Sequence, residues 1–84
     1  MIKAEVDIRL KKGVVDPEGK NITKALRLLD FNEVNAVAVS RRIEIVLNDT
    51  DKEFARKRVD EMCKKLLANP VINDYSITIN DIYE

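Results

Sequence analysis

The chain has 84 residues, with fifteen Lys or Arg, fifteen Asp or Glu and a formal net charge of zero. This length fits a single domain spanning residues 1–84. The net charge of zero argues against a basic surface that binds nucleic acid or an anionic membrane. The chain has no histidine and one cysteine. It therefore lacks the residues for a Ser-His-Asp or Cys-His catalytic site and for a metal site with histidine or cysteine ligands. A single cysteine also cannot form an intrachain disulfide. The sequence therefore predicts no catalytic, cofactor-binding or metal residues. It also predicts no membrane span, no signal peptide and an intracellular compartment.

The first two elements follow clear patterns. Residues 2–10 alternate between apolar and charged side chains, which predicts a strand with one wet face, followed by a turn at Lys12-Gly13. Asp16-Pro17 is typical of a helix start, with a capping carboxylate and proline at the first helical position. A helix over residues 17–30 is expected to carry one apolar stripe, made by Ile22, Ala25, Leu26 and Leu29.

The second half predicts three strands and one helix. The stretch from Val34 to Leu47 indicates two strands joined by a short turn near Ser40-Arg41-Arg42, although no Asn-Gly or Asp-Gly signal marks that turn. Residues 50–53 read as a capping box led by Thr50, and Asn69-Pro70 ends the helix that follows. Its expected apolar stripe is Ala55, Val59, Met62, Cys63, Leu66 and Leu67. A last strand is expected over residues 72–79.

The order strand, helix, strand, strand, helix, strand indicates an α+β fold of the ferredoxin-like βαββαβ type. Such a fold has a four-stranded antiparallel sheet with two helices on one face. RNA-binding domains with this strand order stack bases on exposed aromatic side chains of the open face. Here the first strand offers none, because all the aromatic residues lie elsewhere in the sequence, at Phe31, Phe54, Tyr75 and Tyr83.

Three small groups have both a functional and a structural interpretation. Cys63 is either a nucleophile or a small buried apolar residue, and the absence of histidine favours burial. Residues 11–13, Lys-Lys-Gly, either contact an anion or form a solvated turn. Glu5 and Asp7 share one strand face and either do acid–base work or take part in solvated ion pairs. The structural interpretation is preferred in each case.

The most informative stretch is the predicted edge strand over residues 34–39. Natural edge strands are usually guarded by charge, proline or a bulge, and this stretch has neither charge nor proline. It is either a short edge covered by a loop or an edge that pairs with another chain. The two arginines that follow are either exposed turn residues or partner contacts. The interface candidates are Val34, Ala36, Val37, Ala38, Val39, Arg41 and Arg42.

Several motifs together resemble one known family. They are Leu10-Lys11-Lys12-Gly13-Val14, Val15-Asp16-Pro17-Glu18-Gly19, Asn32-Glu33-Val34 and, most specifically, the run from Glu61 to Tyr75, EMCKKLLANPVINDY. The chain resembles the PurS family, the small subunit of phosphoribosylformylglycinamidine synthase, over nearly its whole length. Ala38 and Ser40 stand where this family typically has arginine and glycine.

The resemblance implies a fold, a set of partners and a role. Members have the same order of strands and helices, form homodimers, and join a glutaminase subunit to a large synthetase subunit that uses ATP and Mg²⁺. The complex makes formylglycinamidine ribonucleotide from formylglycinamide ribonucleotide, glutamine and ATP in cytoplasmic purine synthesis. The small subunit is expected to bind no cofactor, nucleic acid or membrane, and to assist ammonia transfer. The alternative from another class is a small-molecule-sensing regulatory domain with the same strand order.

Overall fold

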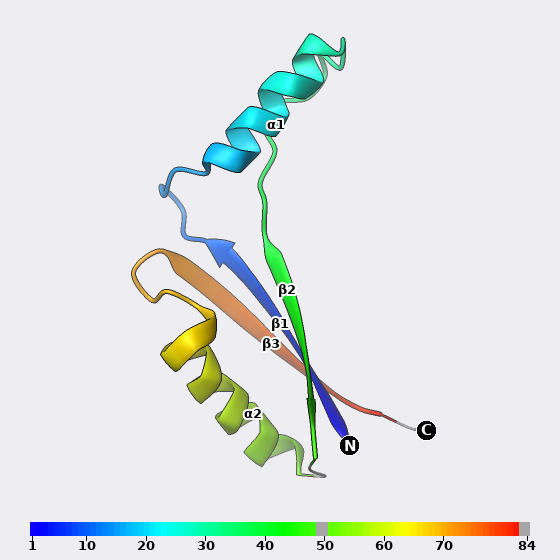
Figure 1. The fold of residues 1–84 in the computed structure, drawn as a ribbon, viewed down its shortest axis with the longest axis vertical. Helices are drawn as coiled ribbons and strands as arrows, with labels where there is room; N and C mark the ends of the chain where they lie inside the picture. The colour runs from blue at the N-terminus through cyan, green and yellow to red at the C-terminus, as the bar shows by residue number, and fades with distance from the viewer. Residues whose placement is uncertain (49–50, 83–84) are drawn as a thin grey trace.

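The computed structural model describes residues 1–48 and 51–82, which form one antiparallel sheet and two α-helices (Figure 1). In chain order the elements are β1 (Ile2–Leu10), α1 (Pro17–Leu28), β2 (Arg41–Leu47), α2 (Lys52–Met62), the π-helical turn η1 (Cys63–Leu67) and β3 (Asn73–Asp81). The sheet order is β2-β1-β3, so that β1 lies in the centre. In register, Val6 lies opposite Ile43 on β2 and Ile77 on β3.

The alternation predicted for residues 2–10 is confirmed by the burial of β1. Its even-numbered side chains through Ile8 are buried, whereas its charged odd-numbered side chains lie on the other face. Helix α2 packs over β1 and β3 on the apolar face, and leaves the β2 side of that face without a helix (Figure 1). The sheet is therefore covered over only part of its apolar face.

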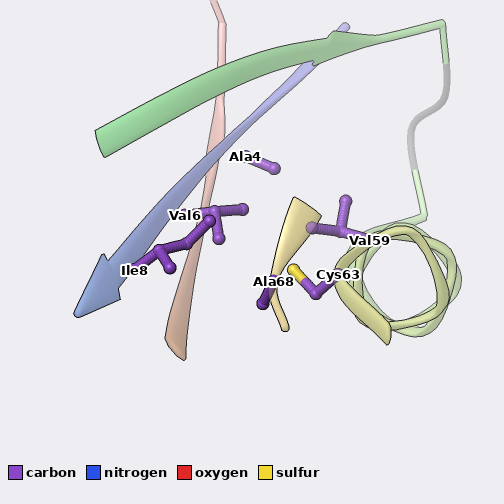
Figure 2. Close-up of a cluster of buried hydrophobic side chains, with 6 residues drawn as sticks. All are labelled: Ala4, Val6, Ile8, Val59, Cys63 and Ala68. Atoms are coloured by element: carbon purple, nitrogen blue, oxygen red, sulfur yellow. The ribbon is translucent and has the colours of Figure 1, made fainter. Parts of the chain in front are cut away.

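The core lies between β1 and the second helical segment (Figure 2). Its buried members are Ala4, Val6, Ile8, Val59, Cys63 and Ala68. Burial raises the pKa of the Cys63 thiol, with the nearby Asp60 carboxylate as a smaller cause. A buried thiol with a raised pKa is a poor nucleophile, so the structural interpretation of Cys63 is confirmed.

The second helix departs from the predicted stripe at its end. The N–H of Ala68 donates to the carbonyl of Cys63 at 2.9 Å, which closes a turn wider than an α-helical one. The wider turn shifts the helical period, so Leu66 is 83% exposed and the prediction that it faces the core is wrong. The predicted cap Thr50 lies outside the described residues. The N-cap is Asp51, whose side chain accepts hydrogen bonds from the N–H groups of Glu53 and Phe54.

The predicted four-stranded sheet with two helices on one face is wrong in two respects. Among the described residues the sheet has three strands, because residues 34–39 run as an extended connection outside it, and the expected turn at residues 40–42 is absent. Helix α1 stands away from the sheet at the end of this connection (Figure 1), and it contributes no residue to the buried core cluster of the described chain. The α+β class and the antiparallel sheet are confirmed.

The projecting part makes the molecule elongated. Its radius of gyration is 16.6 Å, whereas a compact chain of this length has about 12 Å. We refer to residues 14–40, which comprise α1 and the extended connection, as the arm. Within the described residues, no helix has the length and apolar character needed to cross a membrane.

Candidate interaction surface

The arm is held together by side chains of α1 and of its N-cap residue Asp16, which bind the backbone of the extended connection. The Asp16 carboxylate caps α1 by accepting from the Gly19 N–H at 2.9 Å, and its other oxygen accepts from the Val39 N–H at 3.0 Å. The Thr23 hydroxyl oxygen accepts from the Val37 N–H at 3.1 Å and donates to the Gly19 carbonyl at 2.8 Å. These bonds occupy one edge of residues 37–39 as a neighbouring strand would.

Arg27 extends the same arrangement toward the tip of the arm. Its Nε donates to the Val34 carbonyl and its Nη2 to the Asn35 carbonyl, each at 3.0 Å. Hydrogen bonds from a charged donor are stronger than neutral ones. The arm is therefore a defined unit of helix and extended chain rather than a loose loop.

Gly19 allows the helix and the connection to approach closely. A Cβ built on Gly19 would lie 2.3 Å from the Val37 carbonyl oxygen and 2.7 Å from an Asp16 carboxylate oxygen. Both distances are too short for any side chain. Glycine at this position is thus required by packing, although it is a poor helix former.

Gly19→Ala is expected to open the arm. In an ordinary helix this change stabilises by about 1 kcal/mol, but here the methyl group must displace the Val37 carbonyl. We expect lower thermal stability and faster amide exchange at Val37 and Val39. Lys20→Ala, at the next and exposed position, is the control. A stabilised variant with unchanged exchange at both amides would contradict the prediction.

Asp16 gives the arm a dependence on pH. Hydrogen bonds from the N–H groups of Gly19 and then Val39 hold the pKa of the Asp16 carboxyl below its usual range. A carboxyl with a lowered folded-state pKa stabilises the fold above its unfolded pKa, and this contribution is lost as the pH falls through the folded value.

We therefore expect Asp16→Asn to remove part of the loss of thermal stability in acid, below about pH 4. The measurement is thermal unfolding of both proteins between pH 2 and pH 7. Asp7→Asn, at a carboxylate outside the arm, is the control. Identical pH profiles for the wild type and Asp16→Asn would contradict the prediction.

The arm exposes large apolar side chains. Leu28 is 79% and Leu29 67% exposed, and Val15 and Phe31 are also exposed. On the sheet, Ile43, Ile45 and Leu47 of β2 are only partly buried, on the side that α2 leaves uncovered. Large apolar side chains that are left exposed in this way are typical of interaction sites.

The predicted interface candidates divide between the arm and the sheet. Val34 and residues 36–39 lie in the extended connection, with Val37 and Val39 partly buried and Ala36 and Ala38 exposed. Arg41 and Arg42 begin β2 instead of forming a turn. Arg42 makes an ion pair with Glu5 on the open face of the sheet, and the Arg42 guanidinium lowers the pKa of the Glu5 carboxyl.

Sequence reasoning missed the role of Thr23 and Arg27. They lie four residues apart on α1, a spacing that predicts a shared helix face but gives no information about what that face binds. Asp16 was predicted as a helix cap, which is confirmed, but its bond to Val39 joins residues 23 positions apart and has no local signal.

Other groups that bear reactive chemistry do not form a site. In the part of the chain that the structure describes, no group of three or more Cys, Asp or Glu residues is placed to hold a metal ion. Glu5 and Asp7 take part in ion pairs with Arg42, in agreement with the structural interpretation. The Lys11 N–H continues the sheet by donating to the Ile72 carbonyl, and Lys12-Gly13 forms the predicted turn with Gly13 at φ 89°.

The fold and this surface define a small α+β domain whose distinguishing feature is an uncharged edge on a projecting arm, which suits a subunit of a larger assembly. Comparison with known proteins agrees. Residues 3–81 match the family model PurS, described as phosphoribosylformylglycinamidine (FGAM) synthase. The chain belongs to the PurS family and is thus a subunit of FGAM synthase, a ligase of purine biosynthesis.

Individual relatives match over nearly their whole length. The phosphoribosylformylglycinamidine synthase subunit PurS of Methanocaldococcus jannaschii is 50% identical over 82 residues, covering 98% of this chain and 99% of that protein. The crystal structure of a PurS from the same organism has a TM-score of 0.91, with 49% identity, covering 99% of this chain and 100% of that one. A chain in the structure of PurLQS from Thermotoga maritima has a TM-score of 0.74 at 28% identity, covering 94% and 96% of the two chains.

Proposed function

We propose that this chain is a homodimeric, non-catalytic subunit that bridges the glutaminase and the large ATP-dependent synthetase subunit of FGAM synthase in the cytoplasm. The observation that carries the proposal is the arm, which projects from the sheet and exposes an uncharged edge and apolar side chains. The solved PurLQS structure of Thermotoga maritima supports assembly with larger subunits. We propose that ATP and Mg²⁺ are used by the large subunit and not bound by this chain.

The physical role follows from the chemistry of ammonia. Ammonia released by a glutaminase is protonated in neutral water, and the ammonium ion has no free electron pair with which to attack a substrate. A subunit that fixes two larger partners close together raises the effective concentration of ammonia at the second site. Such a subunit needs shape and contact surface rather than reactive side chains, which agrees with the composition of this chain.

Reconstitution tests the proposal. The glutaminase and synthetase subunits of the same organism are assayed with and without this chain, with either glutamine or ammonium chloride as the nitrogen source. We expect glutamine-dependent product formation to require the chain, and ammonium-dependent formation to proceed without it. Full glutamine-dependent activity without the chain would refute the bridging role.

A groove beside α1 supports a second candidate function, that of a regulatory domain. It has a volume of about 910 Å³ and runs between α1 and residues 35–37, lined by apolar Val15 and Leu28 and by the basic side chains of Lys20 and Lys24. A regulatory domain would bind a small anionic effector in such a groove. Thermal unfolding with nucleotides and phosphorylated metabolites discriminates the two functions, because a ligand of the folded state raises the melting temperature.

A further inference from the structure

The outer edge of β3 carries backbone groups that the fold leaves open. Strand β3 ends the sheet order β2-β1-β3, so only one of its edges is bonded to β1. The Lys11 N–H donates to the Ile72 carbonyl at one end of this pair, which shows that the even residues of β3 face β1. The odd residues Tyr75, Ile77 and Ile79 therefore face outward. Within residues 1–48 and 51–82, their N–H groups have no hydrogen-bond partner.

The sequence of this edge does not guard it against pairing. Residues 75–80, Tyr-Ser-Ile-Thr-Ile-Asn, contain no charge and no proline. Natural edge strands usually carry such residues or a bulge, because an open edge pairs with other chains. The side chains of Ile77 and Ile79 are only half-buried on the apolar face, and a strand added at this edge would cover them further. The edge thus has the open backbone and the β-forming side chains of a strand-pairing site.

Helix α2 places charged side chains along the same edge. The Arg56 Nη1 donates to the outward carbonyl of Ile77 at 3.0 Å. One turn further along α2, the Asp60 carboxylate accepts from the Tyr75 hydroxyl at 2.6 Å and pairs with Lys64 at 2.9 Å. The bond to Ile77 independently shows that the odd residues of β3 point outward. It also leaves Arg56 bound to a neutral acceptor.

Two hollows lie along this edge, with volumes of about 480 and 380 Å³, and Arg56 and Lys57 line both of them. In the part of the chain that the structure describes, neither cation has a carboxylate partner. The carboxylates of the hollows are Glu53, in the first turn of α2, and Asp60, which is already bound. We refer to the two hollows, between residues 52–60 and residues 75–79, as the β3 groove. It presents unpaired positive charge beside open backbone groups.

We propose that the β3 groove binds an extended, acidic segment of another subunit of FGAM synthase, which joins the sheet as a strand beside β3. This inference rests on the proposed bridging role and specifies one surface that performs it. The segment pairs with the outward backbone groups of β3, and one of its carboxylates takes Arg56 from the Ile77 carbonyl. A charged acceptor binds a guanidinium more strongly than a neutral carbonyl does, so this exchange favours the complex.

The charges of the β3 groove favour this occupant over a second copy. If two copies paired antiparallel through β3, both α2 helices would lie on the same face of the joined sheet. Arg56 and Lys57 of each copy would then meet across the new pair of strands. Like charges that face each other weaken association, whereas the carboxylates of an acidic segment are attracted to these cations.

Residue-resolved amide hydrogen exchange tests the pairing. It is measured for this chain alone and for the complex reconstituted with the glutaminase and synthetase subunits. We expect exchange at Tyr75, Ile77 and Ile79 to be at least tenfold slower in the complex, with Ser76 and Thr78, which already face β1, as internal references. Slow exchange in the chain alone would assign the edge to a second copy and overturn the proposal. Unchanged exchange in an assembled complex would overturn it but leave the bridging role intact, and subunits that do not associate would refute both.

Two pairs of variants test the backbone and the charge separately. Ile77→Pro removes the outward N–H, whereas Ile77→Ala also loses the isoleucine side chain but keeps this N–H. Arg56→Glu reverses a charge of the groove, and Arg58→Glu makes the same change at an exposed position of α2 outside it. We expect Ile77→Pro and Arg56→Glu each to bind the larger subunits at least tenfold more weakly than its control. Equal binding by Arg56→Glu and Arg58→Glu, both with helical circular dichroism, would overturn the proposal even if Ile77→Pro failed to fold.

Discussion

Val59→Asp is expected to unfold the protein. The Val59 side chain is fully buried between α2 and β1, where an aspartate carboxylate would have no charged partner in the apolar cluster (Figure 2). Burying an unpaired carboxylate costs several kcal/mol, against a total stability of roughly 4 to 13 kcal/mol for a domain of this length. We expect loss of the cooperative thermal transition, followed by circular dichroism at one fixed protein concentration.

Leu66→Asp is the matched control for this change. Sequence periodicity places Leu66 on the same stripe as Val59, yet the π-helical turn leaves it 83% exposed. An exposed substitution changes stability by about 0.5 kcal/mol or less, and Val59→Ala, which only removes buried methyl groups, is expected to cost about 2 to 3 kcal/mol. Equal effects of the two aspartate variants would contradict the assigned core.

Local patterns predicted most of the elements because their causes are local. Alternation determines β1, since every second side chain must enter the core. Asp16-Pro17 begins α1 and Asn69-Pro70 follows the end of the second helix, because capping and proline act within one turn. The π-helical turn was not predicted, since the sequence from Cys63 to Leu67 carries no proline or glycine that would mark a change of period.

The missing hairpin has a different cause. Residues 34–47 are apolar and β-branched enough for two strands, but the N–H groups of Val37 and Val39 bind Thr23 of α1 and its N-cap residue Asp16 instead of another strand. A usable signal was present, because the apolar residues on both sides of residues 40–42 keep the same parity and no Gly, Pro, Asn or Asp lies between them. Continuous parity indicates one straight run of chain.

The sequence predicted the residues of the candidate surface but not which of its two edges is open. An uncharged stretch without proline indicated an unguarded edge in the sequence, and its residues do lie on the projecting arm. Which of its two edges is open depends on Thr23, Arg27 and the second oxygen of Asp16, and these contacts depend on the tertiary position of α1. A tertiary contact of this kind has no signature in periodicity or composition.

Val37→Lys is expected to dissociate the homodimer and to abolish glutamine-dependent synthesis in the reconstituted enzyme. In a homodimer that pairs through the uncharged edge of residues 34–39, the substitution brings an ammonium group from each copy into an apolar contact. Like-charge repulsion and desolvation together weaken association by about 3 kcal/mol or more, or roughly 100-fold. Sedimentation should give a monomer, while product formation from ammonium chloride continues at the wild-type rate.

Val37→Thr is the control, because it keeps the β-branched shape and adds no charge. It should remain dimeric and support glutamine-dependent synthesis. The Lys variant must also keep its helical circular dichroism, since the core between β1 and α2 contains no arm residue within the described chain. A folded Lys variant that sediments as a dimer would exclude Val37 from the dimer interface. A monomer that fully supports the glutamine reaction would show that bridging needs only one copy.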